Sequence, residues 1–307
     1  MKLFIHIGQP KTGSTSIQKS LLLNREALKK NGIALFDCLS NKDDKKLACY
    51  CFDDEKNSRE KEAAGITTGP KLAGFRRNLK NDMSKEIVSN ECRSWVISSE
   101  SLTELESESE KLRLKHLLSE FFSEIVLIGY FRKQDAHILS GYSQKVKSGE
   151  YSSLNIPDVL KLRRKKYNYP DFIESWEKVF GSGCFIPRVF HPDVLVKGSP
   201  VLDFYQIIGA SDIEENTELF SNQSLSDGAI ESLKLINRIL SENGVVLSSE
   251  DRAELIETIS KNTLEEQMKL SSEDLNLIRE EVSANNKVFL ADYFNGLEFN
   301  PLEIKNI

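Results

Sequence analysis

A loop rich in Gly, Ser and Thr near the start of the chain has the residue types that hold phosphate groups. A short apolar run over residues 3–7 precedes the loop, and apolar residues at helical spacing follow it. This order predicts a strand, a loop and a helix, in which free backbone N–H groups and the helix dipole favour an anion. Glycines let the backbone curl around a ligand, lysine adds a charge, and hydroxyl groups can donate to phosphate oxygens. The loop reads Gly8-Gln9-Pro10-Lys11-Thr12-Gly13-Ser14-Thr15.

The spacing of this loop differs from that of nucleoside-triphosphatase loops. The motif G-x-x-x-x-G-K-[ST] requires lysine where this chain has Ser14, and the lysine of this chain, Lys11, lies inside the loop. A phosphoryl-transfer enzyme that uses magnesium would also be expected to offer an Asp at a strand end. The predicted strands end instead at Glu100 and Arg132. A magnesium-dependent kinase or nucleotidase stays an alternative, as does a nucleotide-binding module without catalytic activity.

A second pair of residues with phosphate-binding chemistry follows the apolar run 125–131. Arg132 ends this predicted strand, and Ser140 comes eight residues later on the next predicted helix. A guanidinium can bind phosphate through two parallel N–H donors. About two helical turns can return the Ser140 hydroxyl toward Arg132. The pair is therefore suited to a second phosphate group.

Together the two motifs resemble those of the PAPS-dependent sulfotransferase family, and of its bacterial branch in particular. The first resembles the 5′-phosphosulfate loop and the second the 3′-phosphate site. Looser matches extend to Gly209, and the resemblance is weak over residues 211–284. It implies that PAPS is the donor and that PAP is the product, with no metal requirement. The donor-binding residues that it implies are Lys11, Thr12, Gly13, Ser14, Thr15, Ser16, Arg132 and Ser140.

Sulfuryl transfer to a hydroxyl or amine needs positive charge at the leaving oxygen and a base for the acceptor proton. Lys11 is the candidate for the charge. Glu100 is the candidate base, because it follows the carboxyl end of a predicted strand, the edge where open α/β sheets bind ligands. The resemblance allows a carboxylate or a histidine in this role, so His6 and His137 are alternatives. On an alternating strand, His6 is also expected as a hydrogen-bonded core residue.

The resemblance implies a small-molecule or glycan acceptor. A basic stretch within the acidic chain is compatible with an anionic acceptor such as an acidic glycan. A solvated helix face explains the same residues. The stretch consists of Lys145, Lys147, Arg163, Arg164, Lys165 and Lys166.

Four apolar runs predict the strands that position these residues, namely 3–7, 95–98, 125–131 and 184–190. Helical patterns separate them, which predicts a central parallel sheet flanked by helices in a three-layer, P-loop-like α/β fold. Pro187 indicates that the fourth run is an edge or irregular strand. We expect residues 1–210 to form the PAPS-binding core and residues 211–307 a helical region packed on it, as one structural domain.

The composition of the 307 residues narrows the function classes. A formal net charge of -6 argues against a general nucleic-acid binder. No apolar run approaches the roughly 20 residues of a membrane span, so we expect a cytoplasmic protein without membrane insertion. The five cysteines lack a zinc-ligand spacing and are expected to be reduced thiols. The charged segment 41–62 is expected to be a solvated loop or a substrate-facing insertion rather than core.

Overall fold

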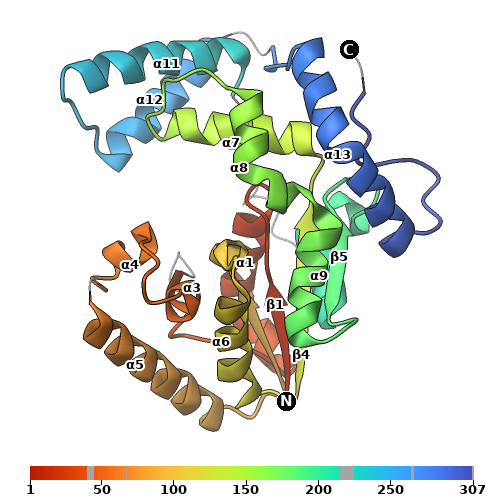
Figure 1. Cartoon of the computed structure of the whole chain (residues 1–307). Coiled ribbons are helices and arrows are strands. Elements are labelled where there is room, and N and C mark those ends of the chain that lie inside the picture. Colours follow the sequence, from red (N-terminus) through yellow and green to blue (C-terminus); the bar gives the residue numbers. More distant parts are fainter. Residues whose placement is uncertain (40–44, 67, 215–224, 264–265, 306–307) are drawn as a thin grey trace. The chain divides into compact units, whose positions relative to one another are not determined.

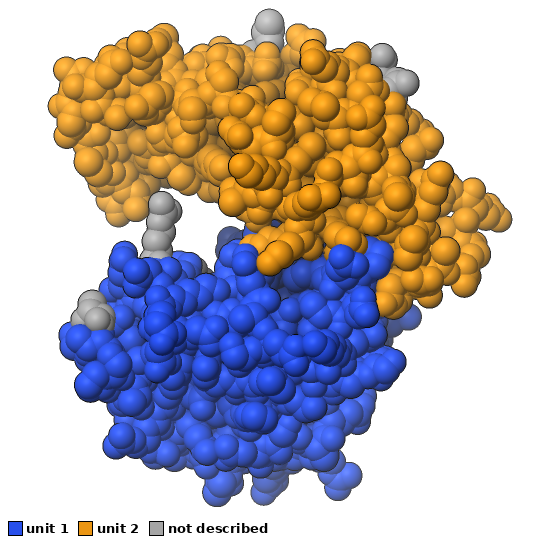
Figure 2. Space-filling view, viewed as in Figure 1, with its two compact units in different colours: residues 1–131, 170–220 blue, residues 132–169, 221–307 orange. Residues whose placement is uncertain are grey.

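A computed structural model of the chain describes residues 1–39, 45–66, 68–214, 225–263 and 266–305 (Figure 1). The chain divides into two compact units, which Figure 2 shows in blue and orange. The first unit consists of Met1–Phe131 and Pro170–Phe220, and the second of Arg132–Tyr169 and Ser221–Ile307. The predicted boundary near residue 210 stays a prediction.

Within the described residues, the first unit is built on a sheet of five parallel strands in the order β2-β3-β1-β4-β5. The predicted fold class, a parallel sheet flanked by helices together with a helical carboxyl-terminal region, is confirmed. Pro187 lies in the edge strand β5, as its missing N–H group predicts. The run 33–35 was not among the predicted strands, because three residues carry too little periodicity. The strands are β1 (Lys2–His6), β2 (Ile33–Leu35), β3 (Ser94–Ser98), β4 (Glu124–Phe131) and β5 (Phe185–Val189).

Helices cover both faces of this sheet. On one face, Phe4, Ile128 and Tyr130 pack with apolar residues of α1, α2 and α10. On the other face, Phe131 lies 5.9 Å, centroid to centroid, from Phe172 of α9. Strands covered on both sides are apolar throughout, which explains their continuous apolar runs. The helices of the first unit are α1 (Ser14–Leu23), α2 (Arg25–Lys30), α3 (Lys45–Cys51), α4 (Arg59–Ala63), α5 (Gly69–Val88), α6 (Glu108–Ser119), α9 (Tyr169–Phe180), α10 (Pro200–Ile208) and the 3₁₀ helices η1 (Glu100–Glu104) and η2 (Val196–Gly198).

The expectation that residues 41–62 form a solvated loop outside the core is wrong where the structure describes them. Residues 41–44 lie outside the described residues, but 45–51 form α3 and 59–63 form α4. Leu47, Ala48 and Cys51 are fully buried on one side of α3. The helix satisfies its own backbone groups and buries one apolar stripe. It therefore belongs to the core, although most residues of the segment around it are charged or polar.

The second unit is helical. Its helix α7 (Gln134–Lys147) packs against α11 (Asp227–Glu242) and α13 (Ser272–Tyr293), and α8 (Ile156–Tyr167) also packs against α13. The buried amides of Gln134 and Asn286 bond to each other reciprocally, at 2.9 and 3.0 Å, and so fix α7 against α13. The remaining helix is α12 (Ser249–Lys261). Across the described residues of both units, no helix has the length and apolar character of a membrane span.

A buried carboxylate, that of Asp203, ties α10 to two strands of the sheet. The residue is 1% exposed, and Arg188 of β5 donates to its two oxygens at 2.9 and 2.5 Å. Tyr130 of β4 donates a third bond of 2.9 Å. The hydrogen bond to Asp203 raises the pKa of Arg188, and burial raises that of Tyr130. These donors compensate the buried charge, so losing either partner would leave the other uncompensated.

We expect Asp203→Ala to lower the free energy of unfolding of the first unit by about 3–5 kcal/mol, since it leaves Arg188 without its counter-ion. Both tryptophans, Trp95 and Trp176, lie in the first unit, so tryptophan fluorescence during urea unfolding measures this unit. The exposed Asp193→Ala serves as the control. An Asp203→Ala curve that matches the control would contradict this role.

Candidate functional site

The phosphate-type loop begins at the centre of the sheet. β1 is paired with β3 on one side and with β4 on the other, with His6 opposite Ser98 and Ile128. Beyond the strand, the N–H of Ile7 still bonds to the carbonyl of Ile128 at 2.8 Å. The loop therefore leaves the carboxyl edge of the sheet, the edge where open α/β sheets bind ligands.

Two glycines allow the loop to pack closely. A Cβ on Gly8 would collide with Ser14 Oγ and lie 2.8 Å from Cε1 and Nε2 of His6. Gly13 has φ 83°, a left-handed conformation, and a Cβ there would lie 2.7 Å from Cγ of Pro200 on α10. Both positions therefore require the smallest residue, because a side chain would clash at each and Gly13 also has a backbone that other residues adopt at a cost.

Two hydroxyl groups act inside the loop. Thr12 is fully buried, and its Oγ1 donates to the carbonyl of Gln9 at 2.6 Å. Ser14 Oγ points at the same carbonyl from 3.4 Å. Thr15 is exposed and Ser16 is half-buried in the first turn of α1. Thr12 thus shapes the loop, while Thr15 and Ser16 present hydroxyls at the surface.

Lys11 has an unusual backbone conformation. Its φ is 68°, and of the non-glycine residues that the structure describes, Lys197 is the other with a positive φ. A left-handed conformation costs a side-chain-bearing residue roughly 1–2 kcal/mol. Such strain persists where the surroundings impose it and is frequent at ligand-binding sites.

The amino end of α1 is open to an anion. Its N-cap residue is Gly13, which supplies no side-chain cap, and its first turn contains no acidic residue. The first N–H groups of a helix lack intrahelical partners and carry the positive end of the dipole. The first N–H groups of α1, together with the hydroxyls of Thr15 and Ser16, are therefore suited to hold one phosphate-sized anion.

His6 lies directly beneath the loop as a core histidine, which is what its place on an alternating strand predicts. It is fully buried, its Nδ1 lies 2.8 Å from Ser98 Oγ, and its ring lies 5.5 Å from those of Tyr130 and Phe204. Its Nε2, which lies beside Gly8, has no hydrogen-bond partner among the described residues. Burial lowers the pKa of His6 to about 3, so the imidazole is neutral near pH 7.

Glu100 lies at the same edge of the sheet as the loop. It begins η1 directly after Ser99, whose N–H donates to the carbonyl of His6 at 2.9 Å. Gln18 of α1 reaches the carbonyl of Ser98 at 3.3 Å, which ties the loop helix to the end of β3. Sequence reasoning did not identify Gln18 or Pro200, because a lone Gln or Pro carries no motif.

Arg132, Ser140 and His137 belong to the second unit. Arg132 directly follows the last residue of β4, and its carbonyl accepts a bond of 2.5 Å from the Tyr169 hydroxyl. Burial lowers the pKa of its guanidinium, and Asp135 and Tyr169 oppose that effect. Ser140 is half-buried on α7, and His137 on the same helix bonds through Nδ1 to the Tyr167 hydroxyl at 3.0 Å.

The predicted basic stretch lies on two helices of the second unit, α7 and α8. Arg164 pairs with Glu281 of α13 at 3.1 Å, which supports a solvated helix face for at least this residue. The other basic residues of the stretch keep both interpretations.

Comparison with known proteins adds one relative. The chain is 30% identical over 163 residues to an uncharacterized protein of Archaeoglobus fulgidus, a match that covers 52% of this chain and 42% of the relative. The matched part is thus less than half of the relative's length. No protein-family model and no solved structure matches the chain. The function is therefore inferred from the residues of the site.

The buried neutral state of His6 predicts a pH dependence of stability. Its pKa is about 3 when folded and near 6.5 when unfolded, so the unfolded chain binds the extra proton between these values and stability falls as the pH falls. We expect His6 to contribute a loss of about 1.4 kcal/mol per pH unit below pH 6.

Urea unfolding followed by tryptophan fluorescence at pH 4, 5, 6 and 7 measures this slope. His6→Asn, which keeps a polar partner for Ser98, should have a shallower slope by that amount. His116→Gln, an exposed control on α6, should keep the slope of the unmodified protein. Equal slopes for all three proteins would show that His6 does not titrate abnormally.

Proposed function

We propose that the chain is a sulfotransferase that uses PAPS and transfers a sulfuryl group to a hydroxyl or amine of a small-molecule or glycan acceptor. The observation that carries the proposal is the conformation of Lys11, held left-handed in a loop that leads into the uncapped end of α1. Lys11 and the amino end of α1 both follow the carboxyl end of β1, a central strand of the sheet, where the first N–H groups of a helix favour an anion.

The loop fits the 5′ end of such a donor. Lys11, Thr15, Ser16 and the first N–H groups of α1 would hold it, while Gly13 keeps the loop close to Pro200. Arg132 and Ser140 would hold the 3′-phosphate, the first as a bidentate cation and the second as a hydroxyl on a rigid helix. When bound, the donor supplies the activated sulfuryl group.

The protein's own part in the chemistry is charge and proton transfer. Lys11 would stabilise negative charge at the leaving oxygen. Glu100 would accept the acceptor's proton, because it follows β3 at the edge where the loop begins. His6 is less suited to this task, because its imidazole is fully buried and bonded to Ser98.

Donor selectivity tests the proposal. In calorimetric titrations we expect adenosine 3′,5′-bisphosphate to bind and Mg-ATP to bind much more weakly. Arg132→Ala and Lys11→Met should each weaken bisphosphate binding roughly tenfold to hundredfold, the range for a lost hydrogen bond to a charged group. Arg77→Ala on α5 and Lys19→Met on α1, both exposed, are the matched controls. A preference for Mg-ATP would move the protein to phosphoryl transfer.

Turnover tests the base. With labelled PAPS and a panel of mono- and oligosaccharide acceptors, we expect Glu100→Gln to lower the transfer rate by roughly 10²- to 10⁴-fold while bisphosphate binding stays unchanged. Glu104→Gln, four residues on in the same 3₁₀ helix, is the control. An unchanged rate in Glu100→Gln would exclude Glu100 as the base and leave the histidines.

A further inference from the structure

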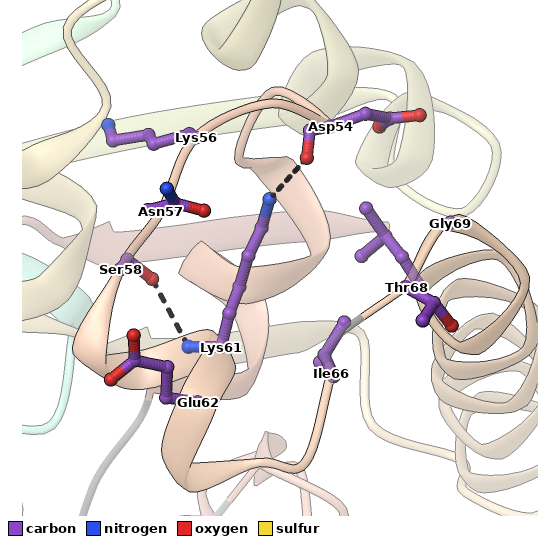
Figure 3. A pocket seen from close by; sticks show the side chains of 10 residues that line it. Asp54, Lys56, Asn57, Ser58, Lys61, Glu62, Ile66, Thr68 and Gly69 are labelled. Atoms are coloured by element: carbon purple, nitrogen blue, oxygen red, sulfur yellow. Dashed lines mark hydrogen bonds between the residues drawn. The ribbon is translucent and has the colours of Figure 1, made fainter.

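A pocket lies in the first unit among α4, the loop before it and the amino end of α5 (Figure 3). Its volume is about 240 Å³, below the roughly 300 Å³ at which pockets for drug-sized ligands begin. It therefore suits a molecule of the size of one sugar residue and is too small for a nucleotide. Its floor is apolar, since Ile66 and Leu72 belong to a small buried cluster with Cys49.

The pocket wall contains a buried cation. Lys61 of α4 is 5% exposed, and its side chain runs between Ser58 and Asp54 (Figure 3). Its Nζ donates to the carbonyls of Asp53 at 2.7 Å and Asp54 at 3.2 Å. An ammonium has three donors, and no carboxylate among the described residues forms an ion pair with Lys61. Buried charges are normally paired, so this one indicates an anionic ligand.

Two other charged residues of the lining are already paired. The Asp54 carboxylate bonds to Arg76 Nη1 at 2.8 Å. Lys56 Nζ bonds to Glu110 at 3.0 Å and to the carbonyl of Glu104 at 2.7 Å. Glu62, which is exposed, lies at the end of α4 away from the Lys61 ammonium in Figure 3. Of the charged residues in the described lining, Lys61 is therefore the buried one without an ion pair, and Glu62 is the exposed one.

The amino end of α5 adds to this positive potential. Thr68 is its N-cap residue but makes no side-chain cap bond, and the first turn of this 20-residue helix contains no acidic residue. An anion beside Lys61 would also interact favourably with the dipole of α5. Asn57, Ser58 and Thr68 supply amide and hydroxyl groups to the same lining.

We propose that this pocket binds a small polyhydroxy carboxylate, such as a uronic acid. The carboxylate would lie between Lys61 and the start of α5, the hydroxyls would contact Asn57, Ser58 and Thr68, and the apolar edge would cover Ile66 and Leu72. The proposal uses no residue of the donor site and does not depend on the proposed function.

D-glucuronate is the probe, and D-glucose, which has a hydroxymethyl group in place of the carboxylate, is its neutral control. In calorimetric or NMR titrations of the full chain, we expect glucuronate to bind at least about tenfold more tightly than glucose. Lys61→Met keeps the apolar stem and should weaken glucuronate binding by about tenfold or more. Lys85→Met, an exposed lysine on α5, should bind as the unmodified protein does.

Thr68→Asp is a second variant that tests the pocket without removing the buried Lys61, so its result does not depend on how Lys61→Met folds. An Asp at the N-cap position favours the helix, and its carboxylate would occupy the anion end of the pocket. We expect an unchanged or higher melting temperature and the loss of glucuronate binding. Equal binding of glucose and glucuronate, or unchanged glucuronate binding in both Lys61→Met and Thr68→Asp, would overturn the proposal. Titration of the same variants with adenosine 3′,5′-bisphosphate reports on the donor site separately.

Discussion

The pairing of β1 with a parallel neighbour on each side is the constraint on which the candidate site depends. Because β3 and β4 flank β1 in register, the chain that leaves β1 emerges beside the chain that leaves β3. This places the loop at 8–13 and Glu100 at the same edge, although more than 80 residues separate them in sequence. The carboxyl edge of a parallel sheet concentrates polar loop residues over an apolar core, as in other open α/β folds.

Two buried polar residues lie beneath that edge, and their surroundings differ in whether they offer a charged partner. His6 has a hydroxyl and two aromatic rings around it and no carboxylate partner in the described residues, so burial favours its neutral form. Asp203 has donors on two strands, since Arg188 and Tyr130 both donate to its carboxylate and so compensate its burial. Asp203 holds α10 to the sheet, and α10 supplies Pro200 against Gly13. The loop thus packs against core residues at two points, with Gly8 against His6 and Gly13 against Pro200.

The segment from α3 to α5 is compact although its charged composition is typical of a solvated loop. Its many charges suggested solvent exposure, yet Arg76 and Lys61 bond to backbone carbonyls and make the segment compact. Long basic side chains bury their apolar stems while their charged ends find acceptors. Composition gives the number of charged residues in a segment but not the groups to which their side chains bond. The core face of α3 and the pocket beside Lys61 were therefore not predictable from the sequence.

The sequence by itself determined the alternation of strands and helices, the parallel sheet and the loop between β1 and α1, and Pro187 restricted its strand to an edge or irregular one. These features depend on apolar periodicity and on Gly and Pro, which act over a few residues. Only the tertiary structure decided the left-handed Lys11, the contact of Gly13 with Pro200, the buried network of Asp203 and the core role of α3. Each of these depends on residues far apart in the chain, whose contacts arise from packing and leave no periodic signal in the sequence.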